Sequence, residues 1–575
     1  MNLFEIYLKD IKKIILKNQN KINFKSKKDL ENIIIENPPS KFNFDLSSNL
    51  ALILARKTNS NPRDIAEKIK NILLKELKDF SKIEVAGPGF LNFKFNSKAW
   101  TKIINNIFKN KKNFGSGNKK KKYNIEFVSA NPTGPLHIGH CRGAIFGDVL
   151  SNLLKFNGNK VTKEYYINDY GNQIKNFAES VFFRLREIKF KENFPEKKKD
   201  LYPGSYIIDI ANKVLKTYPK INLTNFDKIK NKLVKESLKH SMILIKSDLK
   251  NLGIKHDYFF SEKKIVTNNL VDKTVKKLQK NNFVEEGFLE PPKGEESSEW
   301  KNTKKLIFKS TLFGDDSDRS LKKNDGSWTY FANDLAYHAD KVSRKYDCLI
   351  NILGADHTGY TKRISAAVSA LSKNKTTLIC KVCQLVKLFK NGQPYKMSKR
   401  QGEFISVDQL LEEVGKDSVR FMMLNRGNDV ELDFDFDKVL EKSKENPVFY
   451  VQYSYARINS LFRLLNLNLN NKINLNPEKL LPNAFEYQLL RKIIEWPKVV
   501  EIASNKFEPH RVTFYLYDLA TIFHSYWTKG NEDSRFKFIK NGKMNNLLSF
   551  KIFQLTSIVL QSGMNILGVS LPKKM

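Results

Sequence analysis

Two histidines lie where a loop is expected to become a helix, and their spacing is the most informative chemical pattern in the chain. On a helix His137 and His140 would share one face, because residues three apart are neighbours. The helix N-terminus adds backbone N–H groups and the positive end of the helix dipole, which favour phosphate. Gly139 keeps this face open for a nucleotide. The pattern predicts binding and activation of a nucleoside triphosphate; the alternative is a pair of incidental surface histidines.

A basic segment about 260 residues further along the chain supports this interpretation. It consists of Lys396-Met397-Ser398-Lys399-Arg400, and glycine and proline on both sides predict a mobile loop. Its lysines can bring positive charge to a triphosphate and then withdraw. A lysine-rich loop alone is usually solvated surface. Here the two motifs are far enough apart, and in the right order, to complete a split nucleotide-binding sheet.

The elements around these motifs indicate such a sheet. Residues 123–128 favour a short strand, a loop with glycine and proline follows, and residues 137–156 favour an amphipathic helix. Residues 175–310 carry long helical patterns and charged segments. Strand patterns return at TYFA (329–332), DCLINILG (347–354) and VCQLVKLF (382–389). This alternation predicts a parallel sheet interrupted by an insertion.

The chain is long enough for three domains. We expect an α+β module over residues 1–115, a catalytic domain over 116–440 with its insertion at about 175–310, and an all-helical domain over 441–575. The basic, Gly- and Asn-rich segment 109–123 is the best linker candidate in the first half.

Composition sets further limits. A formal net charge of +39 suits a polyanionic partner such as nucleic acid. Lysine and asparagine codons of an A+T-rich genome would give the same excess without selection for binding. No stretch approaches the roughly 20 apolar residues of a membrane span, and no signal peptide is evident, so we expect a cytoplasmic protein without membrane contact.

The four cysteines fit a reducing compartment. Cys380 and Cys383 form one CxxC, but no second ligand pair follows, so no structural metal is expected.

The two motifs resemble the HIGH and KMSKS motifs of class I aminoacyl-tRNA synthetases, with Arg400 in place of the last serine. The resemblance covers essentially the whole chain and is to bacterial arginyl-tRNA synthetases. It rests on VSANPTGPLHIGHCRGAIFGD, YYINDYGNQI, YPGSYI, DGSWTYFANDLAYHADK, NILGADHTGY, KMSKRQG, ENPVFYVQYSYARI and VAGPGFLNF. It implies an α/β fold: a Rossmann-type HIGH/KMSKS catalytic domain with a helical insertion, an N-terminal α+β module that meets the tRNA elbow, and an all-helical C-terminal anticodon-binding domain.

The resemblance also implies roles for individual residues. A guanidinium is planar and permanently charged, so its selection needs acceptors for parallel N–H bonds, which suits Asp334 and Glu126. The arginine-binding set would be Glu126, Ser129, Asn131, His140, Tyr330 and Asp334. The ATP-binding set would be His137, Gly139, His140, Lys396, Met397, Ser398 and Lys399. The catalytic set would be His137, His140, Lys396 and Lys399. For each residue singly, a structural hydrogen bond is the alternative.

The implied reaction is attack of the arginine carboxylate on the α-phosphate of ATP, assisted by Mg²⁺, followed by transfer of arginine to the terminal 2′-OH of tRNA(Arg). The resemblance further implies that adenylate formation requires bound tRNA and that the enzyme is a monomer. Candidate tRNA contacts are Asn92 in the N-terminal module and Tyr453 and Arg457 in the helical domain, where tyrosines can stack on unpaired bases. A tyrosine stripe is more often core, so only some of Tyr450, Tyr453 and Tyr455 should touch RNA.

The other histidines are expected to be structural. His338 and His357 fit a supporting hydrogen-bonding role, and His510 and His524 fit packing in the helical domain.

Three competing functions fit the residues less well. A synthetase for glutamate, glutamine or lysine would share both motifs but not TYFANDLAYHADK or VAGPGFLNF. A small nucleotidyltransferase would leave two thirds of the chain without a purpose. A noncatalytic tRNA-binding protein predicts decay of the motif residues, which are all present.

Overall fold

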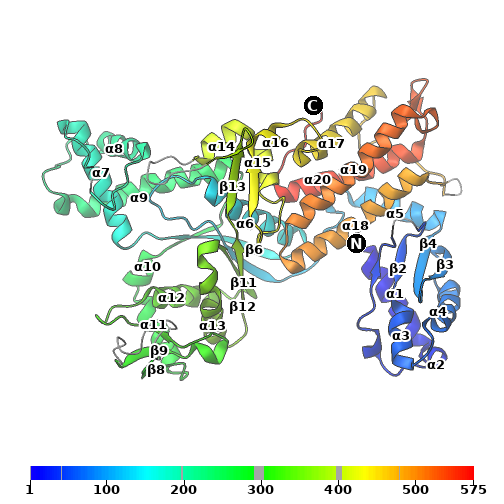
Figure 1. The fold of residues 1–575 in the computed structure, drawn as a ribbon, viewed down its shortest axis with the longest axis horizontal. Helices are drawn as coiled ribbons and strands as arrows, with labels where there is room; N and C mark the ends of the chain where they lie inside the picture. Colours follow the sequence, from blue (N-terminus) through cyan, green and yellow to red (C-terminus); the bar gives the residue numbers. More distant parts are fainter. Residues whose placement is uncertain (1, 40–41, 196–197, 290–302, 396–404, 478–479) are drawn as a thin grey trace. The chain divides into compact units, whose positions relative to one another are not determined.

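The structure is a computed structural model that describes all residues except 1, 40–41, 196–197, 290–302, 396–404 and 478–479. It forms two compact units (Figure 1). The first joins residues 1–118 to residues 441–575, and the second comprises residues 119–440. The compact units thus combine the two ends of the chain and do not separate an N-terminal from a C-terminal domain. The division into three domains at residues 115 and 440 stays a prediction.

The second unit is built on a parallel sheet with the strand order β12-β11-β5-β6-β7, as the sequence predicted. Its strands are β5 (Lys122–Glu126), β6 (Lys160–Ile167), β7 (Tyr258–Ser261), β11 (Cys348–Gly354) and β12 (Thr377–Cys383). In a parallel sheet all carboxyl ends meet at one edge, where ligands usually bind. The side chains that follow these strands therefore converge.

Helix α6 (Ile138–Phe156) connects β5 to β6 and is buried along most of its length. A methyl group on Gly147 would lie 2.3 Å from the Phe127 ring, so only glycine allows this helix to pack so closely on the chain that leaves β5. This contact holds α6 close to the carboxyl end of β5.

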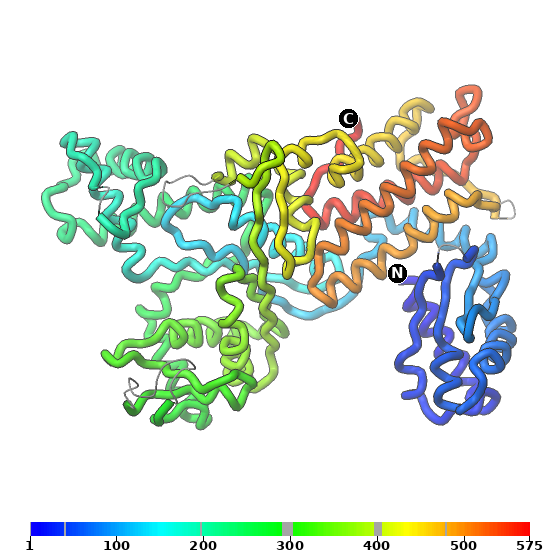
Figure 2. The backbone as a smooth tube through the Cα atoms, viewed as in Figure 1, coloured from blue at the N-terminus to red at the C-terminus, as the bar shows by residue number. Residues whose placement is uncertain are grey.

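Between β6 and β7 the chain forms a helical lobe, which Figure 2 traces beside the sheet. Its helices are α7 (Asn172–Phe190), α8 (Ser205–Thr217) and α9 (Phe226–Asn251), packed around Phe177, Ile207 and Leu233. Strand β7 then returns to the central sheet. The range 175–310 expected to be one insertion thus contains a sheet strand.

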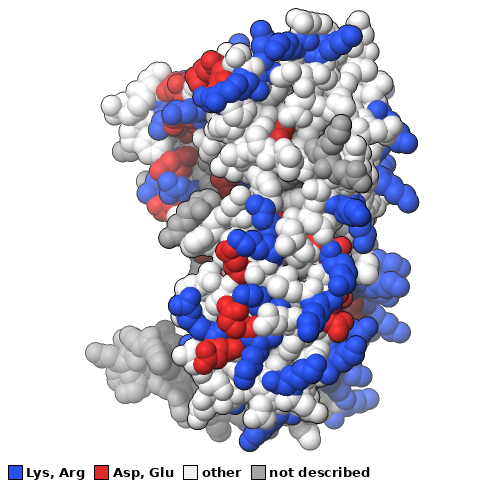
Figure 3. Space-filling view, turned by 90° about the vertical axis from the view of Figure 1, so that its right-hand side faces the viewer, with Lys and Arg blue, Asp and Glu red and all other residues white. Residues whose placement is uncertain are grey.

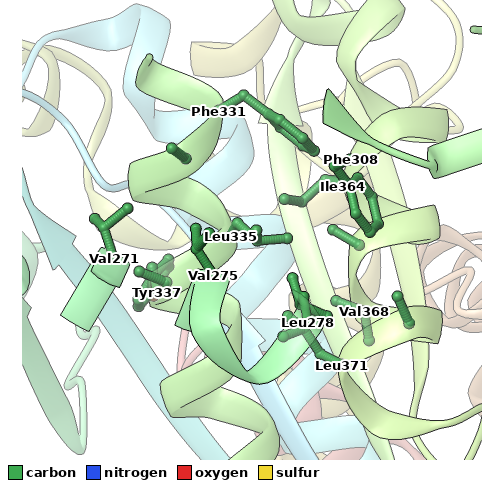
Figure 4. Packing of buried hydrophobic residues seen from close by; sticks show 14 of the residues in the cluster. Val271, Val275, Leu278, Phe308, Phe331, Leu335, Tyr337, Ile364, Val368 and Leu371 are labelled. Atoms are coloured by element: carbon green, nitrogen blue, oxygen red, sulfur yellow. The ribbon is translucent and has the colours of Figure 1, made fainter. Parts of the chain in front are cut away.

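A second lobe follows β7. It consists of α10 (Lys263–Thr267), α11 (Leu270–Gln279), β8 (Val284–Gly287), β9 (Lys305–Phe308), the 3-10 helix η3 (Ser310–Phe313), β10 (Arg319–Ser320), α12 (Tyr330–Ser343), η4 (Ala355–Tyr360) and α13 (Thr361–Ser372). The strands pair antiparallel in the order β10-β9-β8. Figure 4 shows the apolar core, in which side chains of α11, α12, α13 and β9 interdigitate.

The strand predicted at TYFA (329–332) is wrong, because these residues begin helix α12. The Thr329 hydroxyl oxygen accepts a hydrogen bond from the Ala332 N–H and caps the helix. Phe331 and Leu335 then bury one helical face, so capping and packing override the strand preference of the aromatic residues.

The run of strand patterns after residue 377 divides between two sheets. Strand β12 belongs to the central sheet, whereas β13 pairs with β14 and β15. The remaining elements of this unit are β13 (Val386–Lys390), β14 (Gln393–Pro394), α14 (Val407–Val414), α15 (Lys416–Met422), β15 (Leu432–Asp435) and α16 (Phe436–Leu440).

The first unit combines an N-terminal α+β module with C-terminal helices. The module has the antiparallel sheet β1-β2-β4-β3. Its elements are α1 (Leu3–Lys17), α2 (Gln19–Ile22), η1 (Lys27–Leu30), β1 (Ile35–Glu36), β2 (Leu46–Ser48), α3 (Leu50–Thr58), α4 (Pro62–Glu76), β3 (Phe80–Ala86), β4 (Phe90–Phe95), α5 (Ser97–Asn110) and η2 (Lys111–Asn113).

The C-terminal part is helical, as predicted, apart from one short hairpin. It contains α17 (Pro447–Leu464), α18 (Ala484–Lys506), α19 (His510–Glu532), η6 (Ser534–Phe536), β16 (Ile539–Lys540), β17 (Lys543–Met544) and α20 (Leu547–Leu567). On the face turned toward the viewer in Figure 3, lysine and arginine side chains are more widespread than acidic ones. Among the described helices, none combines the length and apolarity needed to cross a membrane.

Candidate active site

His137 and His140 cap helix α6 with each other's help. The Nδ1 atom of His137 accepts a hydrogen bond from the Gly139 N–H at 3.2 Å, and Nδ1 of His140 accepts one from the His137 N–H at 3.2 Å. The two rings lie 4.0 Å apart, centroid to centroid. Because both Nδ1 atoms accept, each neutral ring carries its proton on Nε2 and can donate only from there. The predicted position at the helix N-terminus is thus found.

Gly139 has a local role that the sequence did not indicate. A methyl group at this position would lie 2.9 Å from the His137 ring. Glycine therefore allows the His137 ring to fold back over the first helical turn, and Gly139 itself stays exposed at the surface.

The segment that follows the second motif lies directly beside the first. Ile138 donates its N–H to the Ile405 carbonyl at 3.1 Å, and Val407 donates to the Leu136 carbonyl at 3.2 Å. His137 and Ser406 form the antiparallel bridge between these contacts. Lys396, Met397, Ser398, Lys399 and Arg400 themselves lie outside the described residues.

The backbone between β5 and α6 is strained. Val128 has φ 68° and Ser129 has φ 41°, in the left-handed region that β-branched residues rarely adopt. The Ser129 hydroxyl accepts a hydrogen bond from the Tyr166 N–H at 3.0 Å and donates to Glu126 Oε1 at 3.3 Å. Such strain persists only where neighbours over-determine it, and it concentrates at functional sites.

Two predicted carboxylates come together at this edge of the sheet. Glu126, at the end of β5, accepts from the Tyr337 hydroxyl at 3.0 Å and from the buried Lys341 ammonium. Asp334, on α12, accepts from the Tyr360 hydroxyl. Burial raises the pKa of Asp334 to about 6, the Tyr360 hydroxyl opposes the rise, and the charge of Glu126 adds to it. A cation placed against Asp334 would therefore stabilise its ionised form.

Sequence reasoning missed a third acidic residue, Glu262, which follows β7 and is 7% exposed. Its Oε2 atom is buried and has no hydrogen-bond partner among the described residues. Burial raises its pKa to about 7, and the charges of Asp334 and Asp169 contribute to the rise. Asp169, after β6, is held by the Ser261 hydroxyl at 2.6 Å and by the Lys263 N–H at 2.9 Å.

These four carboxylates form what we call the acidic recess: Glu126, Asp169, Glu262 and Asp334. Burial is the largest cause of the raised pKa of Tyr166, and the charges of all four carboxylates add to it, so each lies near enough to act on this one phenol. Three of them stand at or just after the carboxyl ends of the adjacent strands β5, β6 and β7. That placement was the signal in the sequence that could have revealed Glu262.

Two further predicted arginine contacts lie outside the recess. The Tyr330 ring is 81% exposed, with the Lys323 ammonium 5.5 Å from its centroid. Asn131 is exposed and exchanges hydrogen bonds with Gln173 at 2.9 Å and with Asn168 at 3.1 Å. The structure therefore brings Glu126, Ser129 and Asp334 together, whereas Tyr330 and Asn131 are exposed and have partners elsewhere.

His338 forms hydrogen bonds next to Asp334, which is the supporting role that was expected for it. Its Nδ1 contacts the Asp334 carbonyl at 2.9 Å, and its Nε2 contacts the Asn351 amide at 3.0 Å. Asn351 accepts in turn from Lys341 at 3.0 Å. Burial and the Lys341 charge lower the pKa of His338 to about 3, so it is neutral.

The comparison with known protein families agrees with this geometry. Residues 103–462 match the family described as tRNA synthetases class I (R), catalytic domain, and residues 9–95 match the arginyl tRNA synthetase N terminal domain. Residues 451–575 match the DALR anticodon binding domain. The chain belongs to the arginyl-tRNA synthetases.

Individual members of this family are similar over their full length. An arginine–tRNA ligase of Pelagibacter ubique is 50% identical, with 100% of both chains covered. A solved structure of an arginyl-tRNA synthetase from Campylobacter jejuni has a TM-score of 0.73 and 31% identity, covering 84% of this chain and 100% of that one. The Thermus thermophilus arginyl-tRNA synthetase structure has a TM-score of 0.72 and 19% identity, covering 99% and 100%, and supports the fold.

In the helical part of this arginyl-tRNA synthetase, Arg457 lies between aromatic rings. Its guanidinium is 4.1 Å from the Tyr453 centroid and 5.3 Å from that of Trp527. It also contacts the Tyr453 hydroxyl and Nδ1 of His524, both at 3.1 Å. Burial lowers the pKa of His524 to about 4, so this histidine packs as a neutral ring, as expected.

The other proposed RNA contacts differ in exposure. Tyr450 and Tyr453 are partly exposed, whereas Tyr455 is 6% exposed and accepts a hydrogen bond from Gln561 at 3.0 Å. Asn92 is buried within β4. The tRNA-contact assignments stay predictions.

The residues that the structure describes contain no group of three or more His, Cys, Asp or Glu side chains arranged to hold a metal ion. Cys380 and Cys383 are both in the thiol form, and burial raises their pKa values to about 11 and about 12.

Proposed function

We propose that the acidic recess of this arginine–tRNA ligase binds the guanidinium of arginine and that the first turn of α6 binds ATP beside it. The observation that carries the proposal is the pair Asp334 and Glu262. Both carboxyls are held above their ordinary pKa by burial and by neighbouring carboxylates, and Glu262 has an oxygen without a partner among the described residues. A bound guanidinium would relieve both conditions.

Within the recess the carboxylates have different tasks. Glu126 is already engaged by Lys341, Tyr337 and Ser129, so it shapes the recess and contributes charge. Asp334 and Glu262 are better suited to accept the guanidinium N–H bonds directly. Selection against lysine follows because an ammonium is a compact point charge without the planar fork of N–H groups that can donate parallel bonds at fixed angles.

The arginine carboxylate would then lie toward Ser129, Asn131 and His140, next to the α-phosphate of ATP. One carboxylate oxygen forms a bond to the α-phosphorus while the bond from this phosphorus to the bridging oxygen of pyrophosphate breaks. Negative charge builds on the phosphate oxygens, and the Nε2 protons of His137 and His140 are suited to stabilise it. No covalent enzyme intermediate is required.

Lys396 and Lys399 are proposed to neutralise the leaving pyrophosphate. The backbone pairing of Ile405 with Ile138 supports this role. Lys399 precedes Ile405 by six residues, which span at most about 22 Å. We expect His137→Ala to lower the rate of adenylate formation by about 10²–10³-fold, as for loss of one transition-state donor.

Mg²⁺ is proposed to arrive with ATP. Its ligands would come mainly from phosphate oxygens and water, as is usual for Mg²⁺ on nucleotides. When bound, it would neutralise charge on the triphosphate.

The second step would transfer arginine from the adenylate to the terminal 2′-OH of tRNA(Arg) and release AMP. We propose that Tyr453 and Arg457 meet the anticodon loop and that the N-terminal module, including the region of Asn92, meets the tRNA elbow. A cytoplasmic monomer is the proposed working form, and light scattering measures its mass.

Pyrophosphate exchange with each amino acid, with and without tRNA(Arg), tests the proposal. We expect exchange with arginine alone, and only when tRNA is present. Exchange with lysine but not arginine would overturn the assignment of the recess, and exchange with arginine in the absence of tRNA would remove the proposed dependence on tRNA.

A further inference from the structure

A cavity of about 300 Å³ lies in the first unit, where the end of the N-terminal module meets the C-terminal helices. The buried side chains of Ser557 and Ile558 line it from α20, and the exposed Lys111 and Lys112 line it from η2. The other lining residues are Phe108, Asn110, Asn113, Leu469, Asn470 and Gln561. The cavity is therefore separate from the acidic recess, whose residues belong to the second unit.

Hydrogen bonds between the lining elements give this cavity its shape. Gln554 donates from Nε2 to the carbonyl of Leu469 at 3.1 Å and to that of Asn471 at 2.7 Å, so the loop after α17 is tied to α20. Lys111 donates from Nζ to Asn470 Oδ1 at 3.0 Å, which ties η2 to the same loop. A site that is formed before its ligand arrives loses less entropy when the ligand binds.

The lining of the cavity is positively charged and rich in amides. Two of its ten residues are lysines and four are asparagine or glutamine, and none of these described lining residues is acidic. Ammonium groups and side-chain amides can all donate hydrogen bonds to the oxygens of an anion. The lining therefore favours an anionic ligand.

A buried lysine beside the cavity lacks a counter-charge. Lys551 on α20 is 1% exposed, and its ammonium lies 3.4 Å from the centroid of the Phe108 ring, which lines the cavity. It forms no ion pair or hydrogen bond within the part of the chain that the structure describes. Burial and the charge of Lys472 lower the pKa of Lys551 to about 8. A buried cation is costly without a paired anion, and the face of one aromatic ring compensates only part of that cost.

The arrangement favours a compact anion over a nucleobase or an RNA chain. The Phe108 ring already has two ammonium groups over it, that of Lys551 at 3.4 Å and that of Lys111 at 5.7 Å, so stacking of a base would have to displace a cation. An RNA chain would also have to bring its ribose and neighbouring phosphates to a lysine that is almost fully buried. A small phosphate compound needs only the cavity, and its charged oxygens are strong acceptors for ammonium groups.

We propose that this cavity binds a small polyphosphate or phosphate ester, with phosphate oxygens against the ammonium groups of Lys111, Lys112 and Lys551. The bound anion would bridge the end of the N-terminal module and α20, and so stabilise the joining of the two parts of the first unit. This effector site goes beyond the proposed function and does not depend on it.

The test measures protection of individual lysines of the full-length enzyme from brief acetylation by acetic anhydride, with peptide mass spectrometry as the readout and tripolyphosphate as the probe. Lys111 and Lys112 should be protected in a saturable way, and the midpoint of protection gives the Kd of this cavity even if the active site also binds the probe. The exposed Lys27 and Lys28 of η1, in the same unit, should stay reactive.

The variant Lys551→Met should raise this midpoint about 10- to 100-fold, as for loss of a hydrogen bond to a charged group. It should not lower the unfolding temperature, because an apolar side chain of similar length replaces a buried cation that has no paired anion. The matched control Lys75→Met, at an exposed lysine of α4, should leave the midpoint unchanged.

Three results would overturn the proposal. The first is protection of Lys27 and Lys28 at the same probe concentrations as Lys111 and Lys112, which would show nonspecific ion binding. The second is an unchanged midpoint in Lys551→Met. The third is protection of Lys111 and Lys112 by tRNA(Arg) but not by tripolyphosphate, which would assign this surface to RNA.

Discussion

Replacing Asp334 with asparagine should abolish tight arginine binding while leaving the fold intact. The substitution keeps the size of the side chain, and the Tyr360 hydroxyl can still donate to the amide oxygen. What it removes is one negative charge from a recess where Glu126 and Glu262 remain. The guanidinium then loses one of the acceptors that match its planar N–H groups.

The size of the effect follows from the burial of the site. Removing one partner of a desolvated, hydrogen-bonded charge pair costs about 2–5 kcal/mol. Asp334 is only partly buried, so the lower half of this range applies. At roughly 1.4 kcal/mol per tenfold, the KM for arginine should rise by about 30- to 300-fold. The KM for ATP should change less than about threefold, because His137 and His140 are untouched.

Both constants come from tRNA-dependent pyrophosphate exchange with arginine or ATP varied. Asp316→Asn is the matched control, because this exposed aspartate of the same lobe has the exposed Lys362 as its ion-pair partner. An unchanged arginine KM in Asp334→Asn would remove this residue from the recess. Equal losses for arginine and ATP would show that the variant had disturbed the whole site.

Three other perturbations test the same geometry. Lys341→Met should destabilise the second unit by about 3 kcal/mol in denaturant unfolding, because it leaves the Glu126 carboxylate, whose side chain is 14% exposed, without its cation. The double variant Lys341→Met/Glu126→Gln should recover most of this loss of stability. A single variant as stable as wild type would contradict the reasoning. Asp248→Ala removes the carboxylate that accepts a hydrogen bond from the Leu136 N–H at 2.7 Å, so the loop before His137 should become less ordered. The KM for ATP should then rise about tenfold. The control Asp227→Ala, on the same helix, should leave this KM unchanged. Asp334 and Glu262 must be ionised to bind a guanidinium, and their pKa values are raised to about 6 and about 7. The kcat/KM for arginine should therefore fall as the pH drops from about 7 through 6. A flat pH profile over this range would refute a direct role of these two residues.

Local patterns in the sequence were sufficient to predict a helix or strand where the residues of that element alone determine its structure. The strand expected at 123–128 and the helix at 137–156 correspond to β5 and α6, because an apolar strand, a turn with glycine and proline, and an apolar helical stripe follow one another. TYFA misled because four residues cannot reveal the Thr329 cap or the core that the next turns bury. Strand preference is weak against such packing.

The site was predictable only in part, for a related reason. Motif spacing and family resemblance predicted His137, Glu126 and Asp334 as site residues. Glu262 was missed because residues 258–261 were assigned to the insertion, so the strand that Glu262 follows was not recognised as a partner of β6, some 90 residues earlier in the chain. The pairing of residues 136–138 with 405–407 is likewise a contact between distant segments, which periodicity cannot detect.

The joining of residues 1–118 and 441–575 in one compact unit has a consequence for how the protein is made. The Trp496 indole donates to the Phe114 carbonyl at 3.1 Å, and Trp100 packs edge-on against Tyr487 at 5.9 Å. On a ribosome adding about 5–20 residues per second, the partners of Phe114 and Trp100 emerge roughly 20–80 seconds later, after the whole second unit. During that interval the apolar side of α5 is without its cover, so the nascent chain is a natural client for chaperones until translation ends.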